Sequence, residues 1–204
     1  MFVQGSLFGL CDPDVDRAFA ETRRVPLDDA SWIEYTPGWL AGSDGVFDDM
    51  LDRLELRQRR NIPMYDSLVD EPRLTAMWHE FDYPDGGPTP LLDEIRQLLT
   101  KRHHRPFDSI GFNLYRDGAD SVAWHGDRHR QYVTDPVVAI LSVGAPRPLR
   151  LRPRGGGASL SWDLGAGDLF VMGGACQHDW EHCVPKLRRS VGPRMSITFR
   201  HDTR

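Results

Sequence analysis

Residues 113–127 read Asn-Leu-Tyr-Arg-Asp-Gly-Ala-Asp-Ser-Val-Ala-Trp-His-Gly-Asp, and the rest of the chain is organised around this stretch. It begins as a strand, turns at Asp117 and Gly118, and ends with His125 and Asp127 two residues apart. In an extended chain, residues i and i+2 point to one face, so the imidazole and the carboxylate can bind the same metal ion. A second histidine would complete a facial triad, which leaves coordination positions open on Fe(II). Taken alone, the pair does not distinguish a metal site from a solvated turn.

The length of 204 residues fits one domain with a full hydrophobic core. No apolar run approaches the length of a membrane span, and the first residues lack a basic start followed by a long apolar region. Three cysteines are too few and too odd in number for a disulfide framework. We therefore expect a cytoplasmic protein that has no membrane partner and is a monomer.

The net charge of −5 conceals an uneven distribution. Residues 1–100 carry 20 acidic and 9 basic side chains, whereas residues 101–204 carry 10 and 16. Of the 25 basic residues, 23 are arginine, whose planar group suits phosphates and carboxylates. A compositional bias explains the arginine excess equally well. The overall charge argues against a general nucleic-acid coat, but the basic second half permits a local phosphate-binding face.

The hydrophobic pattern predicts helices first and strands later. Apolar residues near helical spacing predict helices over 45–58 and 89–101, and a first strand is expected near 32–35. Residues 61–87 are aromatic-rich and rich in turn residues, which indicates an irregular flap. Short strands with glycine-rich turns are expected at 109–115, 122–125, 136–143, 147–152, 158–163, 167–172, 181–184 and 193–200.

These elements predict an α+β fold, with a double-stranded β-helix (jelly-roll) core and N-terminal helices on one side. We divide the single domain into an N-terminal arm and support helix (1–60), a lid (61–88) and a helix plus jelly-roll core (89–204).

The strand over residues 194–200 reads Arg-Met-Ser-Ile-Thr-Phe-Arg and alternates polar with apolar residues. Strand geometry places Arg194, Ser196, Thr198 and Arg200 on one face. A solvent-facing polar side explains this strand on its own, so its role depends on what lies beside it.

His182 offers the missing third ligand for His125 and Asp127. A competing reading of the same segment is a zinc site formed by Cys176, His178, His182 and Cys183. These are suitable ligand types, but their spacing lacks the paired pattern of structural zinc modules.

Several motifs together resemble the AlkB family of Fe(II)/2-oxoglutarate-dependent dioxygenases. They are Asn-x-Tyr followed by His-x-Asp, a distant Trp-x-His-x-Val-Pro-Lys and a terminal Arg-x5-Arg. The human-type DNA and RNA demethylases of that family are the closer match. They share with this chain the motif Asp-Ser-Val-x-Trp-His-x-Asp at 120–127 and the motif Thr-Phe-Arg at 198–200. The resemblance covers about residues 72–200.

The resemblance implies that His125, Asp127 and His182 are the catalytic Fe(II) ligands. It also implies a cosubstrate, 2-oxoglutarate, that reacts together with O₂. Arg194 would pair with the distal carboxylate of 2-oxoglutarate, while Arg200 would lie nearer the metal.

The same resemblance places Asn113 and Tyr115 as hydrogen-bond donors to 2-oxoglutarate. Ser196 stands where the family commonly has Asn, and would make a weaker cosubstrate contact.

The flap is expected to be a nucleotide-recognition lid, because enzymes that modify a base hold it between flat side chains. We expect Trp78 to stack on the extruded base, with Tyr83 and Arg128 as further substrate contacts. The family often has acidic residues immediately after its metal-binding Asp, whereas this chain has Arg128 and His129. We therefore expect Arg128 to turn outward to a phosphate.

The predicted function is oxidative demethylation of N-alkylated nucleobases in DNA or RNA, with release of formaldehyde, succinate and CO₂. Two alternatives remain open: the same chemistry on RNA or on a small N-alkyl compound, and a catalytically silent jelly-roll that only binds.

Overall fold

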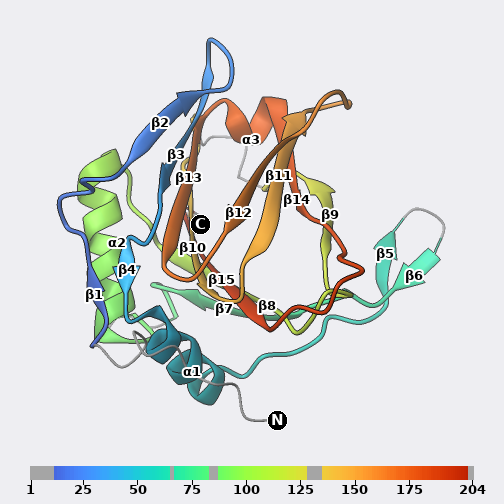
Figure 1. Ribbon diagram of the computed structural model, residues 1–204, viewed down its shortest axis with the longest axis horizontal. Helices are drawn as coiled ribbons and strands as arrows, with labels where there is room; N and C mark the ends of the chain where they lie inside the picture. The colour runs from blue at the N-terminus through green and yellow to red at the C-terminus, as the bar shows by residue number, and fades with distance from the viewer. Residues whose placement is uncertain (1–11, 65–66, 83–86, 128–134, 202–204) are drawn as a thin grey trace.

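Two antiparallel β-sheets face each other in the computed structural model, which describes residues 12–64, 67–82, 87–127 and 135–201 (Figure 1). The larger sheet has seven strands in the order β2-β3-β13-β10-β15-β8-β7, and the smaller has four in the order β12-β11-β14-β9. This arrangement is a jelly-roll core. The strand β15, last in chain order, lies in the middle of the larger sheet between β8 and β10.

The larger sheet is formed by β2 (Arg23–Pro26), β3 (Ser31–Thr36), β7 (Leu74–His79), β8 (Ser109–Tyr115), β10 (Val138–Gly144), β13 (Asp168–Gly174) and β15 (Arg194–Arg200). The smaller sheet is formed by β9 (Val122–His125), β11 (Arg147–Pro153), β12 (Leu160–Leu164) and β14 (Trp180–Val184). Two short pairs complete the described strands: β1 (Asp14–Val15) with β4 (Leu40–Ala41), and β5 (Ile62–Met64) with β6 (Ser67–Val69).

The helix α2 (Pro90–His103) has a defined beginning and end. The Thr89 hydroxyl accepts a hydrogen bond from the Leu92 backbone N–H at 3.2 Å, and Pro90 occupies the first turn. The helix ends at His104, which adopts a left-handed conformation with φ of 52°. These bounds lie close to the predicted helix at 89–101.

The helix α1 (Ser43–Arg53) is shorter than the predicted helix over 45–58. Leu54 already has extended backbone angles, and Leu54 and Leu56 pack against the core from an extended segment. The apolar spacing was correct, but it continued past the end of the helix. A third helix, α3 (Cys176–Asp179), is a single turn between β13 and β14.

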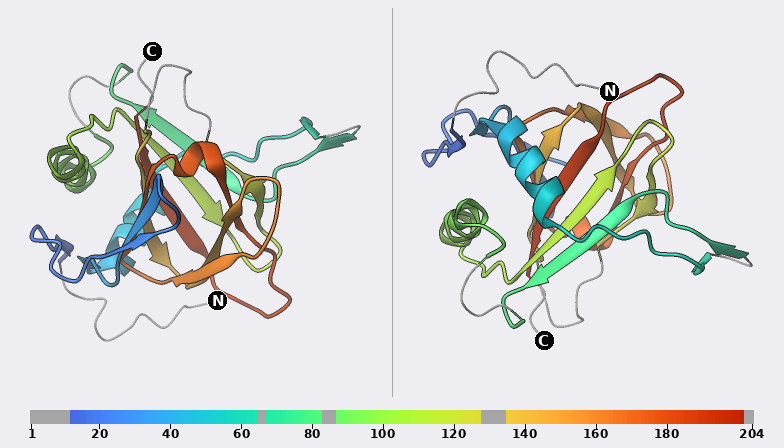
Figure 2. Two further views of the ribbon diagram at one scale, coloured as in Figure 1. Left: turned by 90° about the horizontal axis from the view of Figure 1, so that it is seen from above. Right: turned by 90° about the horizontal axis from the view of Figure 1, so that it is seen from below.

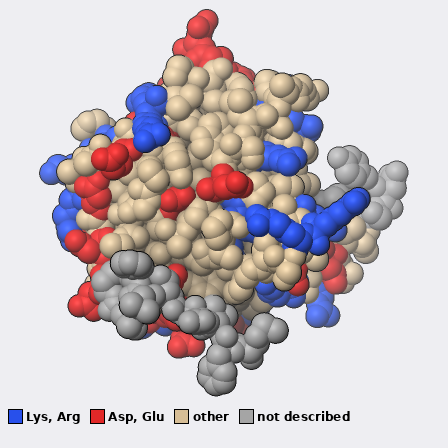
Figure 3. Space-filling model, viewed as in Figure 1, with Lys and Arg blue, Asp and Glu red and all other residues tan. Residues whose placement is uncertain are grey.

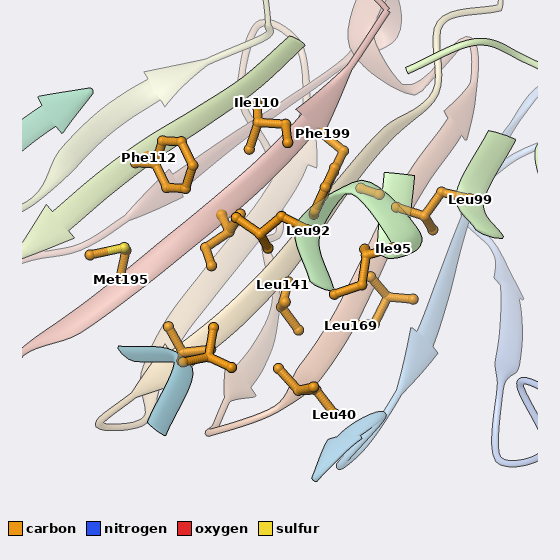
Figure 4. Packing of buried hydrophobic residues seen from close by; sticks show 14 of the residues in the cluster. Leu40, Leu92, Ile95, Leu99, Ile110, Phe112, Leu141, Leu169, Met195 and Phe199 are labelled. Carbon is orange, nitrogen blue, oxygen red and sulfur yellow. The ribbon is translucent and has the colours of Figure 1, made fainter. Parts of the chain in front are cut away.

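The two faces of the larger sheet bury separate apolar clusters. On the outer face, Leu92, Ile95 and Leu99 of α2 pack against strand residues such as Phe199 and Leu141, as Figure 4 shows. Between the two sheets lies a second cluster, which includes Ile140 and Phe170 from the larger sheet and Leu149 and Leu151 from the smaller. The open end of this inner space contains the polar residues considered below.

The segment 61–87 is more regular than predicted. It contributes the β5–β6 hairpin, which extends away from both sheets (Figure 2), and β7, an edge strand of the larger sheet. In the described ranges, no helix is both long and apolar enough to span a lipid bilayer.

Trp78 does not lie where the sequence analysis placed it. The side chain is 5% exposed and belongs to the cluster under the helices, whereas Met77 is 50% exposed. On β7, Met77 pairs with Gly111 and Trp78 with the buried Ile110, so neighbouring residues face opposite sides of the sheet. The prediction that Trp78 stacks on a base is therefore wrong, because this side chain faces the core.

Replacing Trp78 tests this assignment. Trp78→Ala should lower the free energy of unfolding by about 3–5 kcal/mol, because it leaves a large cavity beneath the helices. The matched change Met77→Ala on the other face should alter it by no more than about 0.5 kcal/mol. Urea unfolding followed by circular dichroism measures both. Equal effects of the two changes would contradict the packing described.

Candidate metal and cosubstrate site

A cavity of about 60 Å³ lies between the two sheets at their open end. One wall carries His125, Asp127 and His182, whose ligand atoms lie within 4.8 Å of one another. Nε2 of His125 is 3.8 Å from Oδ1 of Asp127, and the two imidazole rings lie 4.3 Å apart between centroids. The structure thus brings together the three residues that the sequence analysis selected as Fe(II) ligands.

An irregularity in β9 turns His125 toward the cavity. Val122 pairs with Val184 and His125 pairs with His182, so three steps along β9 match two steps along β14. In a regular strand, residues three apart would face opposite sides; the extra residue lets both point inward. Nδ1 of His125 lies 2.8 Å from the backbone carbonyl of Ala123 within this bulge. Because a carbonyl only accepts, Nδ1 carries the proton and Nε2 keeps its lone pair for a metal.

The electrostatics of the triad favour metal binding. Burial, with a further contribution from His125, lowers the pKa of His182 to about 3, so its imidazole is neutral. Burial alone would raise the pKa of Asp127, but Arg200 and the two histidines hold it well below its usual range. Arg200 donates to both carboxylate oxygens of Asp127, at 3.1 and 3.2 Å. A neutral imidazole and an ionised carboxylate are the forms that ligate metals.

The backbone at the ligand pair is held by a residue that the sequence analysis missed. The Asp127 N–H donates to the buried Gln177 side chain at 3.0 Å. Gly126 packs closely against α3: a Cβ on this residue would lie 2.7 Å from the backbone carbonyl oxygen of Gln177. No local pattern marks Gln177 for this contact, because Gln177 and Asp127 lie 50 positions apart in the sequence.

Arg194 lines the opposite end of the cavity and is 1% exposed. Its Nε donates to the Ser142 hydroxyl at 2.9 Å, while its Nη2 is buried without a hydrogen-bond partner. No described residue forms an ion pair with it. Burial lowers the pKa of this guanidinium to about 10, so it stays charged at neutral pH. A buried cation with a free donor requires an anionic partner, and a carboxylate of a bound molecule fits that need.

The polar face of β15 points into the cavity rather than to solvent. Arg194, Ser196 and Thr198 are all at most 5% exposed and line the cavity. On the neighbouring strand β8, Tyr115 pairs with Arg194 and Asn113 pairs with Ser196, so the five predicted cosubstrate residues, Arg200 included, surround one space.

Arg73, the residue immediately before β7, is a second residue that the sequence analysis did not select. It lines the same cavity, and its Nε donates to the Asn113 side-chain oxygen at 3.0 Å. This bond leaves the amide group of Asn113 pointing toward Ser196, at 3.5 Å from its hydroxyl. Arg73 therefore links the edge strand next to the β5–β6 hairpin to a predicted cosubstrate residue.

A groove of about 1470 Å³ continues outward from the cavity and shares His125, Asp127 and Arg73 with it. Met77 and the hairpin residues Ile62 and Val69 lie along the groove. Of the predicted substrate contacts, Trp78 does not line it, and Tyr83 and Arg128 lie outside the described residues.

The donor set fits the groups that the sequence analysis named. Two imidazoles and a carboxylate suit Fe(II), and the unpartnered Arg194 nitrogen suits a dicarboxylate such as 2-oxoglutarate. The zinc alternative does not hold, because the triad is the sole cluster of potential metal ligands found in the described ranges. Cys176 belongs to the inner apolar cluster, and burial raises its pKa to about 12.

Comparisons with known proteins agree with this geometry. The 2OG-Fe(II) oxygenase superfamily model matches residues 56–200. The chain is similar to the bovine alpha-ketoglutarate-dependent dioxygenase alkB homolog 3, at 33% identity over 80% of this chain and 64% of that protein. It is 31% identical to the Arabidopsis thaliana DNA oxidative demethylase ALKBH2, over 54% of this chain and 41% of that one.

The fold is also similar to that of a Pseudomonas putida prolyl-4-hydroxylase, with a TM-score of 0.55 at 17% identity, over 84% of this chain and 93% of that one. The chain spans slightly less than two thirds of the length of the bovine alkB homolog 3. From the matched model, the relatives and the triad, we conclude that this chain belongs to the AlkB family within the 2OG-Fe(II) oxygenase superfamily.

Proposed function

We propose that this protein is an Fe(II)- and 2-oxoglutarate-dependent dioxygenase that removes N-alkyl groups from nucleobases in DNA or RNA. One observation carries the proposal: a buried arginine with a free donor shares a small cavity with a His-Asp-His triad, and the cavity opens into a large groove. A small dicarboxylate fits the cavity, and a nucleobase has access to the triad through the groove.

The two ends of the cavity would bind different groups. His125, Asp127 and His182 would hold Fe(II), and Arg194 would hold the distal carboxylate of 2-oxoglutarate with help from Asn113 and Tyr115. When bound, Fe(II) with 2-oxoglutarate and O₂ supplies the oxidation of an N-methyl C–H bond. The hydroxylated methyl group then leaves the nitrogen as formaldehyde.

The protein side chains prepare this chemistry through position and charge. Arg200 keeps Asp127 ionised and oriented, and the Ala123 carbonyl fixes the proton of His125 away from the metal position. The apolar side chains of Val122, Ile140, Leu149 and Val184 also line the cavity and limit access of water to the site.

We further propose that the β5–β6 hairpin and β7 act as the nucleotide-recognition lid. These elements form one side of the groove, and exposed Met77 lies on that side. Lys and Arg side chains gather over the four-stranded sheet on the face drawn in Figure 3. Exposed cations there and in the segment after β14, among them Arg150, Lys186 and Arg188, suit a phosphodiester backbone. The name of the Arabidopsis relative, a DNA oxidative demethylase, supports a nucleic-acid substrate.

Turnover of defined substrates tests the function. The purified protein with Fe(II), 2-oxoglutarate and ascorbate should convert methylated oligonucleotides to unmethylated ones, with one succinate and one formaldehyde per methyl group. Mass spectrometry of a DNA and RNA panel, with methylated free bases in parallel, separates the substrate classes. Succinate formation that no nucleic acid stimulates would point to a small N-alkyl substrate, and no succinate at all to a binding module.

The first site prediction concerns the metal. Asp127→Ala and the isosteric Asp127→Asn should both abolish demethylation and weaken Fe(II) binding, because neither offers an anionic ligand. His178→Ala is the matched control, since this exposed histidine lies in the same region outside the triad. Metal content after anaerobic loading measures the effect. Normal iron content in both Asp127 variants would remove Asp127 from the ligand set.

The second site prediction concerns 2-oxoglutarate. Arg194→Ala should weaken its binding by about 2–5 kcal/mol, seen as a steep rise in KM, because a buried carboxylate loses its partner. Arg194→Lys should recover only part of this loss, since an ammonium group cannot reproduce the planar fork. Calorimetric titration with 2-oxoglutarate provides an independent measurement. An unchanged affinity in Arg194→Ala would place the cosubstrate elsewhere.

A further inference from the structure

The bulge in β9 places Trp124 in an unusual position. Ala123 and Trp124 together oppose the single residue Cys183 of β14, between the Val122–Val184 and His125–His182 pairs. His125 points into the cavity, whereas Trp124 is half-buried and lines the outer groove together with Cys183. The groove therefore wraps around the edge strand β9, with the triad on its inner side and an indole ring beside it.

Arg152, which does not line the groove, covers one face of the Trp124 ring. The Arg152 guanidinium lies over the ring at 4.1 Å from its centroid, and Arg152 in turn donates to the Glu181 carboxylate at 2.5 Å. Both of these side chains are largely buried, at 29% and 14% exposure. A stacked cation and a buried ion pair hold the indole in one orientation, so it loses little freedom when a ligand stacks on it.

We propose that Trp124, supported by Arg152, is the binding site for the unpaired nucleobase next to the one being demethylated. This inference rests on the proposed function. An indole face is a sequence-tolerant platform for a base. Trp124 and His125 are neighbours on β9 and both line the groove, so a nucleic-acid strand in the groove can present the target base to the triad at His125 and the next base to the indole.

A base-binding site at Trp124 restricts the form of nucleic acid that the groove can bind. A base that stacks on Trp124 cannot also be stacked within a duplex, so the preferred ligand is a single-stranded segment with at least one intact base beside the target. A free methylated nucleotide lacks this contact. The groove is large enough for more than one nucleotide unit, and the exposed Lys186 also lines it.

A coupling experiment tests the site. Wild type, Trp124→Ala and Trp124→Phe are assayed on two single-stranded oligonucleotides with one methylated base, which differ only in having intact or abasic neighbours. Trp124→Ala should lower kcat/KM on the intact oligonucleotide by about 5- to 150-fold, chiefly through KM. On the abasic-flanked substrate, Trp124→Ala should match wild type. Trp124→Phe should retain most of the activity on both, because a phenyl ring still stacks.

Two controls separate stacking from general damage. Trp162→Ala removes a partly buried tryptophan of the same sheet that does not line the groove, and should show the same modest effect on both substrates. Fluorescence anisotropy with unmethylated versions of both oligonucleotides should show the same coupling without any turnover.

The outcomes separate this inference from the proposed function. Equal losses on both substrates in Trp124→Ala would make the ring a support for His125 only, and no loss on either would remove it from the interface. Either result overturns the subsite while wild type still demethylates. Absence of both oligonucleotide binding and formaldehyde release in wild type would instead overturn the proposed function.

Discussion

The buried guanidinium of Arg194 is the constraint on which the inner space of this protein depends. A charge enclosed between two sheets is costly unless its donors are satisfied, and Ser142 satisfies only one of them. The surrounding strands therefore keep polar side chains inward where a jelly-roll would ordinarily place apolar ones. Asn113 and Ser196 lie on the same inner face of the larger sheet as Arg194. At the other end of the cavity, Asp127 and Arg200 form an ion pair. The result is a polar cavity lined on its remaining wall by apolar side chains.

Much of this arrangement was predictable because its signals are local. The two-residue spacing of His125 and Asp127 and the alternation from Arg194 to Arg200 both follow from strand geometry, and the structure has both on strands or directly after one. The third ligand, His182, required the family resemblance, since nothing local distinguishes it from His178. Most of the strands after residue 108 were also placed within a few residues of their observed bounds.

Other features depend on tertiary contacts that no local pattern reports. Trp78 and Met77 are both apolar, so which of them faces the core was set by the pairing of β7 with β8. The contacts of Gln177 with Asp127 and of Arg73 with Asn113 join residues 50 and 40 positions apart. The bulge in β9 cannot be recognised in the sequence either, because it is a shift in the register of β9 against β14. Each of these unpredicted features adjusts the position of a residue that was predicted.

The place of β15 in the larger sheet has a consequence for how the protein folds. This strand comes last among the strands, yet it separates β8 from β10 and carries both Arg194 and Arg200. While the chain is being synthesised, the sheet stays in two parts and the triad lacks the cation that orients Asp127. Long-range pairing of this kind is slow, and unpaired strand edges are prone to aggregate. The cavity between the two sheets, whose Arg194 and Arg200 both lie on this strand, is thus among the last structures to form.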